Sequence, residues 1–264
     1  MQIITITSDW NEYDYYVASL KGKLLTHCPG ASIIDISHRV KPFHTAQAAF
    51  LVRNSYPNFP RGTIHIIAVN TEPEDGGQLL AARMADQYFL CADNGMLGLL
   101  GGPGPDMVVR LEGLPDQQTG TFISLSLLSD MACRLAKGTP LKELGTPVES
   151  YNRQVPLRPT IEGSIITGSV IHVDSYQNAI TNISREFFQK VGGGRPFRIY
   201  VQSKHYVLEK INTRYNESPP GDILAIFNSI GLLEIAIRKG NAAGLLKLTT
   251  SSTVRIEFNE QEDA

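Results

Sequence analysis

The 264-residue sequence lacks the features that mark membrane or nucleic-acid-binding proteins. No apolar stretch approaches the roughly 20 residues of a membrane-spanning helix, and Met1 runs straight into a strand-like segment, which predicts no signal peptide. The 24 basic and 26 acidic side chains give a formal charge of −2 without a run of like charges. We therefore expect a cytoplasmic protein that binds neither nucleic acid nor a membrane.

Cysteine is scarce as well. Cys28, Cys91 and Cys133 are odd in number, far apart in the chain and set in apolar stretches. This pattern is typical of free, buried thiols in a reducing compartment. A chain of this length buries enough apolar surface to fold without disulfides or metals.

The common signatures of cofactor, metal and hydrolase sites are absent. The first strand-like run is not followed by GxGxxG, and the chain has no GxxxxGK(S/T) loop and no GxSxG elbow. The six histidines form no HxxxH, HxH or Cys/His cluster, so no metal site is predicted. Each histidine is expected to be a surface residue or an internally hydrogen-bonded one.

The first half of the chain alternates short apolar runs with amphipathic stretches, which predicts βαβ units and a largely parallel sheet. A hairpin is expected around Ala85-Asp86, and a short helix after Asn94-Gly95. Strands are predicted at 3–7, 32–37, 63–70 and 107–112, and longer helices at 17–28, 44–54 and 124–137.

The second half of the chain lacks the alternation of strands and helices seen in the first half. Residues 138–159 contain four prolines and little periodicity, so they are predicted to be a linker. Many short β-rich runs follow, separated by GG, PPG and KGN turns, with short helices at 185–191 and 241–246. This spacing is typical of a small antiparallel barrel or sandwich. The prediction is an α/β N-terminal domain (1–150) with a largely parallel central sheet, plus an all-β C-terminal barrel domain (160–264).

The stretch SDWNEYDYYVASLKG (8–22) follows the first predicted strand. Ligands of open parallel sheets bind beyond the carboxyl ends of the strands, so Asp9 is placed to accept hydrogen bonds from a pair of ligand hydroxyls. The alternative is a helix cap, a role that Asn11 or Asp14 could also fill.

Two further loops follow predicted strands. VNTEPEDGG (69–77) contains the acids Glu72, Glu74 and Asp75, and its alternative interpretation is a solvated turn. ADNG (92–95) is more typical of a turn with a cap than of a site.

A polar and aromatic pattern marks the second half. In DSYQNAITN (174–182), Asp174, Tyr176 and Asn178 alternate, and in a strand they would share one face. Such a face would suit a purine ring with its ribose. Two later turns, FNSIG (227–231) and RKGN (238–241), add small and amide residues.

Several of these stretches occur together, and in the same order, in one family. The sequence resembles the S-adenosylmethionine (SAM) hydroxide adenosyltransferases, also called adenosine-forming SAM hydrolases, which share their fold with the fluorinating and chlorinating SAM enzymes. The matching stretches cover nearly the whole chain: TSDWNEYDYYVASLKGKLL, IIDISHRVKPFHTAQAAFLV, FPRGTIHIIAVN, FLCADNGMLGLL, HVDSYQNAITNI and FNSIGLLEIAIRKGNAAGLL.

The resemblance implies a homotrimer that binds SAM or adenosine between the N-terminal domain of one subunit and the C-terminal domain of the next, with no cofactor beyond SAM. By position, it implies that Asp9 holds the ribose hydroxyls and that Phe43 and Asn70 line the ribose and sulfonium region. It further implies contacts to the methionine and adenine parts by Asp174, Tyr176, Asn178, Ser229, Arg238 and Lys239.

The sequence departs from the family at the residues that activate water. The family hydrolases use an Asp, an Arg and a His, and these places hold Asn70, Gly77 and Ile123. None of the three can take a proton from water. Ser124 stands where the halogenating relatives place a serine near the halide, although it could also be a helix N-cap. The catalytic candidates are therefore Asn70 and Ser124, and an acid of the 69–77 loop could replace the lost base.

Three functions remain open on these residues. The first is an enzyme that cleaves SAM at ribose C5′ to adenosine, or a 5′-substituted adenosine, and methionine, with a non-standard nucleophile site. The second is a SAM- or adenosine-binding homologue that has lost catalysis, and the third is a halide-dependent adenosyltransferase. We place the first ahead, because a binding groove this complete is otherwise unexplained.

Overall fold

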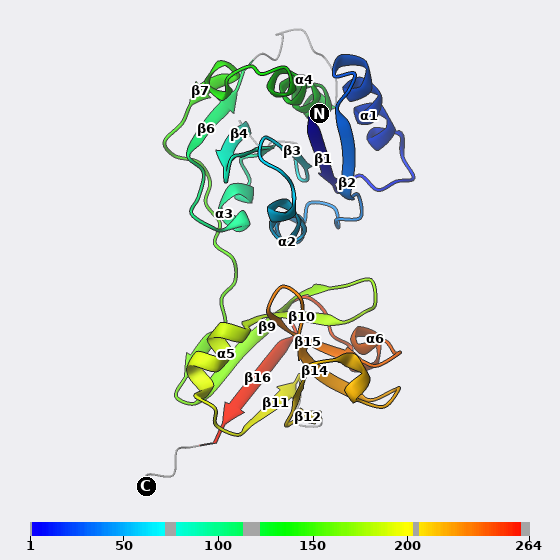
Figure 1. The fold of residues 1–264 in the computed structure, drawn as a ribbon, viewed down its shortest axis with the longest axis vertical. Coiled ribbons are helices and arrows are strands. Elements are labelled where there is room, and N and C mark those ends of the chain that lie inside the picture. The colour runs from blue at the N-terminus through cyan, green and yellow to red at the C-terminus, as the bar shows by residue number, and fades with distance from the viewer. Residues whose placement is uncertain (1, 72–77, 113–121, 203–205, 260–264) are drawn as a thin grey trace. The chain divides into compact units, whose positions relative to one another are not determined.

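The computed structural model describes residues 2–71, 78–112, 122–202 and 206–259. The chain divides into two compact units, Met1–Pro156 and Leu157–Ala264 (Figure 1). The first unit contains a seven-stranded sheet and the second a nine-stranded sheet.

Four strands of the first sheet run parallel to one another. The β-branched run of β1 (Ile3–Ser8) lies between β2 (Ser32–Ser37) and β3 (Ile64–Ala68), and β3 also pairs with β5 (Gln87–Ala92). The carboxyl ends of these strands consequently meet at one edge of the sheet, the place where open parallel sheets bind ligands.

The other half of the sheet is antiparallel. The hairpin predicted at Ala85-Asp86 is confirmed: it joins β4 (Leu79–Met84) to β5 with both turn residues at positive φ. A two-residue connection can join only antiparallel strands, so β4 reverses the sheet. Antiparallel pairing continues through β6 (Met107–Leu111) to β7 (Gly145–Pro147). The sheet is therefore mixed, and the prediction of a largely parallel sheet is wrong for this half.

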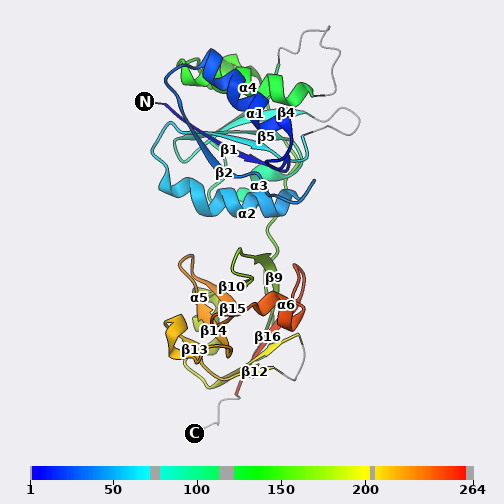
Figure 2. The same cartoon turned by 90° about the vertical axis from the view of Figure 1, so that its right-hand side faces the viewer.

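Helices cover both faces of the first sheet (Figures 1 and 2). One face packs α1 (Tyr15–His27) and α4 (Ile123–Ala136) on one apolar cluster, and the other packs α2 (Thr45–Ser55) and α3 (Met96–Leu100) on a second. The predicted helical segments are confirmed. No helix among the described residues is long and apolar enough to cross a bilayer.

The segment predicted to be a linker contributes structure to the first unit. It contains the 3₁₀ turn η2 (Leu141–Glu143) and strand β7 at the sheet edge, where Thr146 pairs with Arg110. Periodicity could not reveal so short a strand, because three residues give no repeat.

The second unit is a nearly barrel-shaped sheet. Its strands pair in the order β12-β11-β16-β9-β10-β15-β14-β13, with β8 added beside β9. Among the described strands of this unit, only β13 and β14 pair in parallel. Two short helices are present, as predicted: α5 (Arg185–Gly192) and α6 (Ala242–Leu246). The strands are β8 (Thr160–Glu162), β9 (Ile165–Val173), β10 (Ala179–Ser184), β11 (Phe197–Val201), β12 (Val207–Leu208), β13 (Ile211–Asn212), β14 (Ile223–Phe227), β15 (Leu232–Ile237) and β16 (Thr253–Phe258).

One histidine is part of the first core. His65 is fully buried in β3, with Nδ1 2.7 Å from Thr5 Oγ1 and Nε2 2.5 Å from Gln87 Oε1. The predicted internally hydrogen-bonded role is confirmed for this residue. Burial lowers the pKa of His65 to about 4, although the hydrogen bond to Gln87 acts in the opposite direction.

This depressed pKa predicts a loss of stability in mild acid. Between the unfolded pKa of about 6.5 and the folded pKa of about 4, the unfolded chain binds a proton that the folded chain does not. The free energy of unfolding should therefore fall by about 3 kcal/mol as the pH falls across this window. Urea unfolding at pH 7.5 and 4.5 measures the change. His65→Gln should flatten the dependence, whereas His27→Gln at an exposed position should not; equal slopes for both variants would refute the assignment.

Candidate functional site

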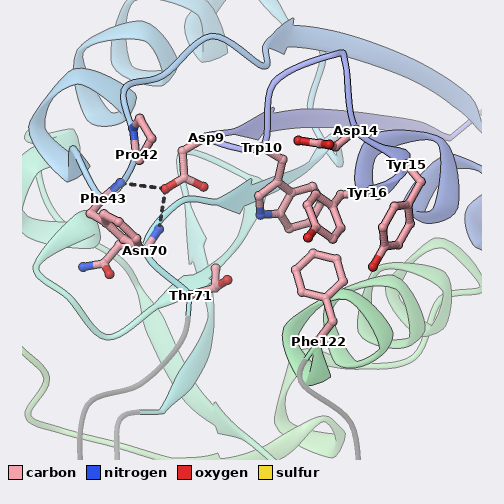
Figure 3. Close-up of a pocket in the computed structure, with 10 residues that line it drawn as sticks. All are labelled: Asp9, Trp10, Asp14, Tyr15, Tyr16, Pro42, Phe43, Asn70, Thr71 and Phe122. Carbon is pink, nitrogen blue, oxygen red and sulfur yellow. Dashed lines mark hydrogen bonds between the residues drawn. The ribbon is translucent and has the colours of Figure 1, made fainter.

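A pocket of about 350 Å³ lies where the parallel strands of the first sheet end (Figure 3). Asp9 follows β1, Phe43 comes from the loop after β2, and Asn70 follows β3. The shared edge of the parallel strands thus brings together three of the four candidates that the sequence placed in the first unit, the fourth being Ser124.

Asp9 organises this pocket through its carboxylate. Its Oδ2 accepts the backbone N–H of Phe43 at 2.8 Å and that of Asn70 at 3.2 Å. Both donors have left-handed backbones, with φ of 64° and 49°, a conformation that is strained in non-glycine residues and collects at functional sites. Among the described residues, none donates a hydrogen bond to Oδ1, which leaves this oxygen for a ligand.

The helix-cap alternative for Asp9 is wrong. Asp14 occupies the N-cap position of α1, and its side chain makes no capping hydrogen bond. Asn11, with φ of 62°, accepts instead from the N–H of Glu12 at 2.6 Å. The carboxylates of Asp9 and Asp14 both line the pocket, because neither is used to cap the helix.

Asn94 holds the Asn70 loop in place and was missed as a site residue in the sequence. Its Nδ2 donates to the carbonyls of Val69 and Asn70, each at 3.1 Å, and its Oδ1 accepts the N–H of Met96 at 3.2 Å. The predicted turn is confirmed, but the N-cap position of α3 is Gly95, which has no side-chain capping bond. The Asn94 side chain also reaches the end of β3. The sequence feature that could have identified Asn94 is its position just after β5, the fourth of the parallel strands, whose carboxyl ends form the pocket edge.

Aromatic rings form the wall opposite Phe43 (Figure 3). Phe122 has its ring centroid 4.9 Å from that of Trp10 and 4.8 Å from that of Tyr16, and Tyr15 lies 4.4 Å from Tyr16. The crowding of aromatic residues at 8–22 pointed to this wall, although only Asp9 was predicted there. Aromatic faces beside carboxylates suit a nucleoside or an organic cation. Within the described chain, no three His, Cys, Asp or Glu side chains gather as metal ligands would.

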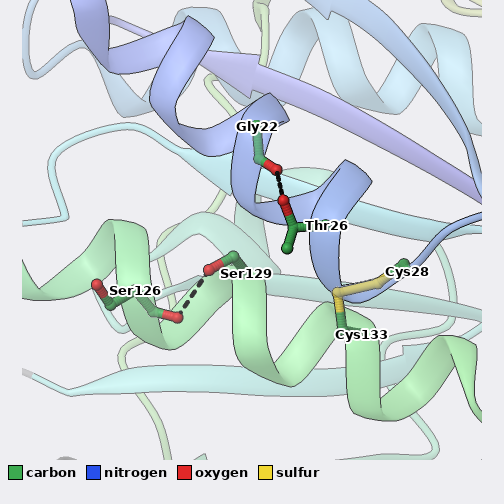
Figure 4. The surroundings of a disulfide bond; sticks show 6 residues. All are labelled: Gly22, Thr26, Cys28, Ser126, Ser129 and Cys133. Carbon is green, nitrogen blue, oxygen red and sulfur yellow. Dashed lines mark hydrogen bonds between the residues drawn. A yellow bond between two sulfur atoms is a disulfide. The ribbon is translucent and has the colours of Figure 1, made fainter.

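A disulfide joins the two helices that carry this wall (Figure 4). Cys28, at the C-terminal end of α1, is bonded to Cys133 of α4, and Cys91 is free and buried. The prediction of three free thiols is thus wrong for two of them. The cysteines are 105 residues apart, and only the packing of α1 on α4 brings their Cα atoms to 5.5 Å.

The catalytic candidates near α4 are described only in part. Helix α4 begins at Ile123, with Phe122 in the N-cap position, so the alternative of Ser124 as the N-cap is wrong. The helix begins one residue earlier than predicted, which puts Ser124 inside its first turn. The side chains of Ile123 and Ser124, and the residues Gly77, Glu72, Glu74 and Asp75, lie outside the described part of the structure.

In the second unit, residues 174–178 form a turn between β9 and β10 rather than a strand. Asp174 Oδ1 accepts the N–H of Asn178 at 2.8 Å, and its Oδ2 lies 3.2 Å from Asn178 Nδ2. The predicted common face is therefore wrong: Asn178 is buried against Asp174, whereas Tyr176 is 79% exposed. A carboxylate that binds a backbone amide four residues later closes the chain into a turn.

The remaining candidates lie at opposite ends of β15. Ser229 is exposed in the turn before this strand, while Arg238 and Lys239 follow it. Arg238 Nη1 donates to Ser218 O at 2.7 Å, and Lys239 is exposed with φ of 53°. Since Ile235 pairs with Ala179, the 174–178 turn lies at the Arg238 end of the strand, away from Ser229.

A buried carboxylate supports the Ser229 turn and was not predicted. Glu234 is 2% exposed and accepts from Tyr215 Oη at 2.7 Å and from Asn228 Nδ2 at 3.2 Å. Burial raises the pKa of Glu234 above its usual value. Asn228 Oδ1 in turn accepts the N–H groups of Ile230 and Leu232, which builds the turn around Ser229.

Models of one protein family match both units of the chain. The model of the SAM hydroxide adenosyltransferase N-terminal domain matches residues 4–145, and that of the C-terminal domain matches residues 168–255. A protein of Thermus thermophilus named (R)-S-adenosyl-L-methionine hydrolase is 29% identical, over 97% of this chain and 100% of its own. A protein of the same name from Salinispora arenicola is 27% identical over 96% and 97%. A fluorinase of Actinoplanes is 25% identical over 96% and 97%.

Solved structures show the same fold. A conserved protein from Thermotoga maritima superposes with a TM-score of 0.86 and 25% identity, over 97% of this chain and 99% of its own. A conserved protein from Thermus thermophilus gives a TM-score of 0.76 and 27% identity, over 97% and 100%.

Proposed function

The chain belongs to the SAM hydroxide adenosyltransferase family, and on that basis we propose that it binds SAM and cleaves it at ribose C5′. The products are methionine and either adenosine or a 5′-substituted adenosine. The observation that carries the proposal is the Asp9 carboxylate, which faces a pocket at the ends of the parallel strands with one oxygen left for ligand hydroxyls.

The proposed reaction is an in-line displacement. A nucleophile bonds to C5′ while the bond from C5′ to sulfur breaks, and the electron pair of that bond returns to sulfur, so neutral methionine leaves. The positive sulfonium is already an activated leaving group, so the protein has to orient the reactants and exclude bulk water. The aromatic wall of Trp10, Tyr16 and Phe122 supports this role. No cofactor beyond SAM takes part in the proposal.

The three candidate functions differ in which nucleophile, if any, attacks C5′. Water must lose a proton as it attacks, and neither Asn70 nor Ile123 can accept one. Their presence favours, as a second candidate, a homologue that binds SAM or adenosine without catalysis. A halide brings no proton, and the fluorinase relatives together with Ser124 favour a halide-dependent adenosyltransferase as the third. Asn70 and Ser124 remain the proposed residues near the nucleophile.

The proposed assembly is a homotrimer in which the second unit of a neighbouring copy completes each pocket. Exposed rings that line the pocket support a covering partner, since Tyr15 is 69% and Phe43 70% exposed. Light scattering measures the oligomeric state, and a monomer would refute the proposed trimer.

The contacts proposed for the methionine and adenine parts are Asp174, Tyr176, Asn178, Ser229, Arg238 and Lys239. A cytoplasmic location is part of the proposal, and the Cys28–Cys133 disulfide would be an exception to the reduced thiols of that compartment.

One experiment separates the three functions. The pure protein is incubated with SAM, with and without chloride, and adenosine, chloro-adenosine and methionine are followed by mass spectrometry. We expect adenosine and methionine to form at equal rates without halide. Calorimetry with SAM on the same samples measures binding. Chloro-adenosine that requires chloride would favour the third function, tight binding without product the second, and no binding would refute all three.

A further inference from the structure

His38 lies beneath the turn that carries Asp9 and is 3% exposed. Its Nδ1 is 2.7 Å from Oγ of Ser8, the fully buried residue before Asp9. Its backbone carbonyl accepts the N–H of Asn11 at 3.0 Å. One residue therefore holds both ends of the four-residue segment 8–11.

The far side of the imidazole faces a carboxylate. His38 Nε2 is 3.1 Å from Asp35 Oδ1, an ion-pair distance that is not aligned as a hydrogen bond, and Asp35 also contacts Lys21. Because a hydroxyl both donates and accepts, the Nδ1 contact joins His38 to Ser8 whichever ring nitrogen carries the proton. Ser8 has no exposed surface and does not line the pocket, which excludes it as a nucleophile.

The contacts of His38 matter because the pocket is built from strained segments. Asn11, Phe43 and Asn70 all have left-handed backbones, and such residues persist only where the surroundings determine their conformation. Phe43 and Asn70 are tied to the Asp9 carboxylate itself. The Asp9 backbone has one further bond, a long one of 3.4 Å from its N–H to Ala68 O. The direction of the carboxylate is therefore set by these two bonds together with the way segment 8–11 is held.

We propose that His38 is a positioning residue of the pocket, which acts through its Nδ1 bond to Ser8 to aim the Asp9 carboxylate at a ligand diol. The proposal rests on the proposed function only in taking the ligand to be an adenosyl compound. His38 touches no ligand; its effect passes through Ser8 and the backbone.

Two amide variants each keep one of the two side-chain contacts of the His38 ring and remove the other. In His38→Asn, the side-chain amide reaches the place of Nδ1 and can still accept from Ser8. In His38→Gln, it reaches the place of Nε2 and keeps only the Asp35 side. We expect His38→Asn to bind adenosine within about threefold of the wild type and His38→Gln to bind about tenfold more weakly, the effect of one lost hydrogen bond. Calorimetry with adenosine measures both, and thermal melting checks that they are equally folded.

Variants of Ser8 test the same hydrogen bond from its other partner, and they serve if a His38 variant does not fold. Ser8→Thr keeps the hydroxyl and should bind adenosine like the wild type, whereas Ser8→Ala should show the tenfold loss. Where SAM turns over, we expect KM to rise in the weak variants with kcat unchanged, since aligned binding of the ribose is lost in ground and transition states alike.

The outcomes separate the two proposals. A wild type that binds adenosine, with His38→Asn and His38→Gln equally affected, would overturn the positioning role and leave the proposed function standing. A wild type that binds neither adenosine nor SAM would overturn both. Asn rescue alongside Gln loss, at matched melting temperatures, supports the positioning role, because a merely structural residue would affect stability and affinity together.

Discussion

Replacing Asp9 with Asn is expected to weaken SAM binding about a hundredfold while the protein stays folded. The Asn amide oxygen can still accept the N–H groups of Phe43 and Asn70, so the turns around the pocket keep their partner. What the variant loses is the negative charge that faces the ligand hydroxyls. Hydrogen bonds to charged groups contribute about 1.5–3 kcal/mol, and a hundredfold loss corresponds to about 2.7 kcal/mol. Calorimetric titration with SAM measures it.

Two further variants make this test specific. Asp9→Ala also removes the acceptor of two backbone N–H groups, an exposed one and a part-buried one, so it should additionally lower the free energy of unfolding by about 1 kcal/mol. Glu12→Gln is the matched control, because it removes one negative charge from the same turn at a half-exposed side chain that pairs with Arg39. It should bind SAM like the wild type. Equal losses for Asp9→Asn and Glu12→Gln would mean that net charge alone is responsible and that the Asp9 assignment is wrong.

Reducing the Cys28–Cys133 disulfide is expected to lower the melting temperature of the first unit by roughly 10–20 °C. The bond closes a loop across 105 residues, and a cross-link of that span lowers the chain entropy of the unfolded state by an amount worth about 5 kcal/mol. It also ties the ends of α1 and α4, whose other ends carry the aromatic wall. Calorimetric melting with and without dithiothreitol measures the shift.

The third cysteine supplies the control. Cys91→Ala should keep the shift caused by dithiothreitol, because Cys91 is a free thiol, whereas Cys133→Ala should abolish it. Alkylation of the denatured, unreduced protein gives an independent count. One labelled thiol per chain is expected, and three would show that the disulfide is absent in solution.

Much of the local structure could be predicted from the sequence. The β-branched run 32–37 is strand β2, and the helical spacing of Val17, Leu20 and Leu24 buries one face of α1. The hairpin at Ala85-Asp86 also lies where it was predicted. These features depend on residues within a few positions of one another, because strand and helix periods are short.

Some local patterns were misread, and each misreading has a physical cause. The alternation in 174–178 resembles a strand, but the Asp174 carboxylate binds the Asn178 amide and closes a turn. Ser124 resembles an N-cap, but α4 begins earlier, after Phe122. A polar side chain can bond to its own backbone or to a neighbouring element, and periodicity does not distinguish the two.

By itself, the sequence determined the family motifs, most of the helices and strands, and the place of Asp9 at the end of the first strand. The tertiary structure decided which distant residues meet. The Asp9 carboxylate bonds to N–H groups 34 and 61 residues away, the disulfide spans 105 residues, and His38 lies beneath Ser8. These contacts depend on the packing of whole helices on a mixed sheet, in which every local segment is compatible with several partners. Only the folded chain selects one set, because only that set buries all the apolar faces together.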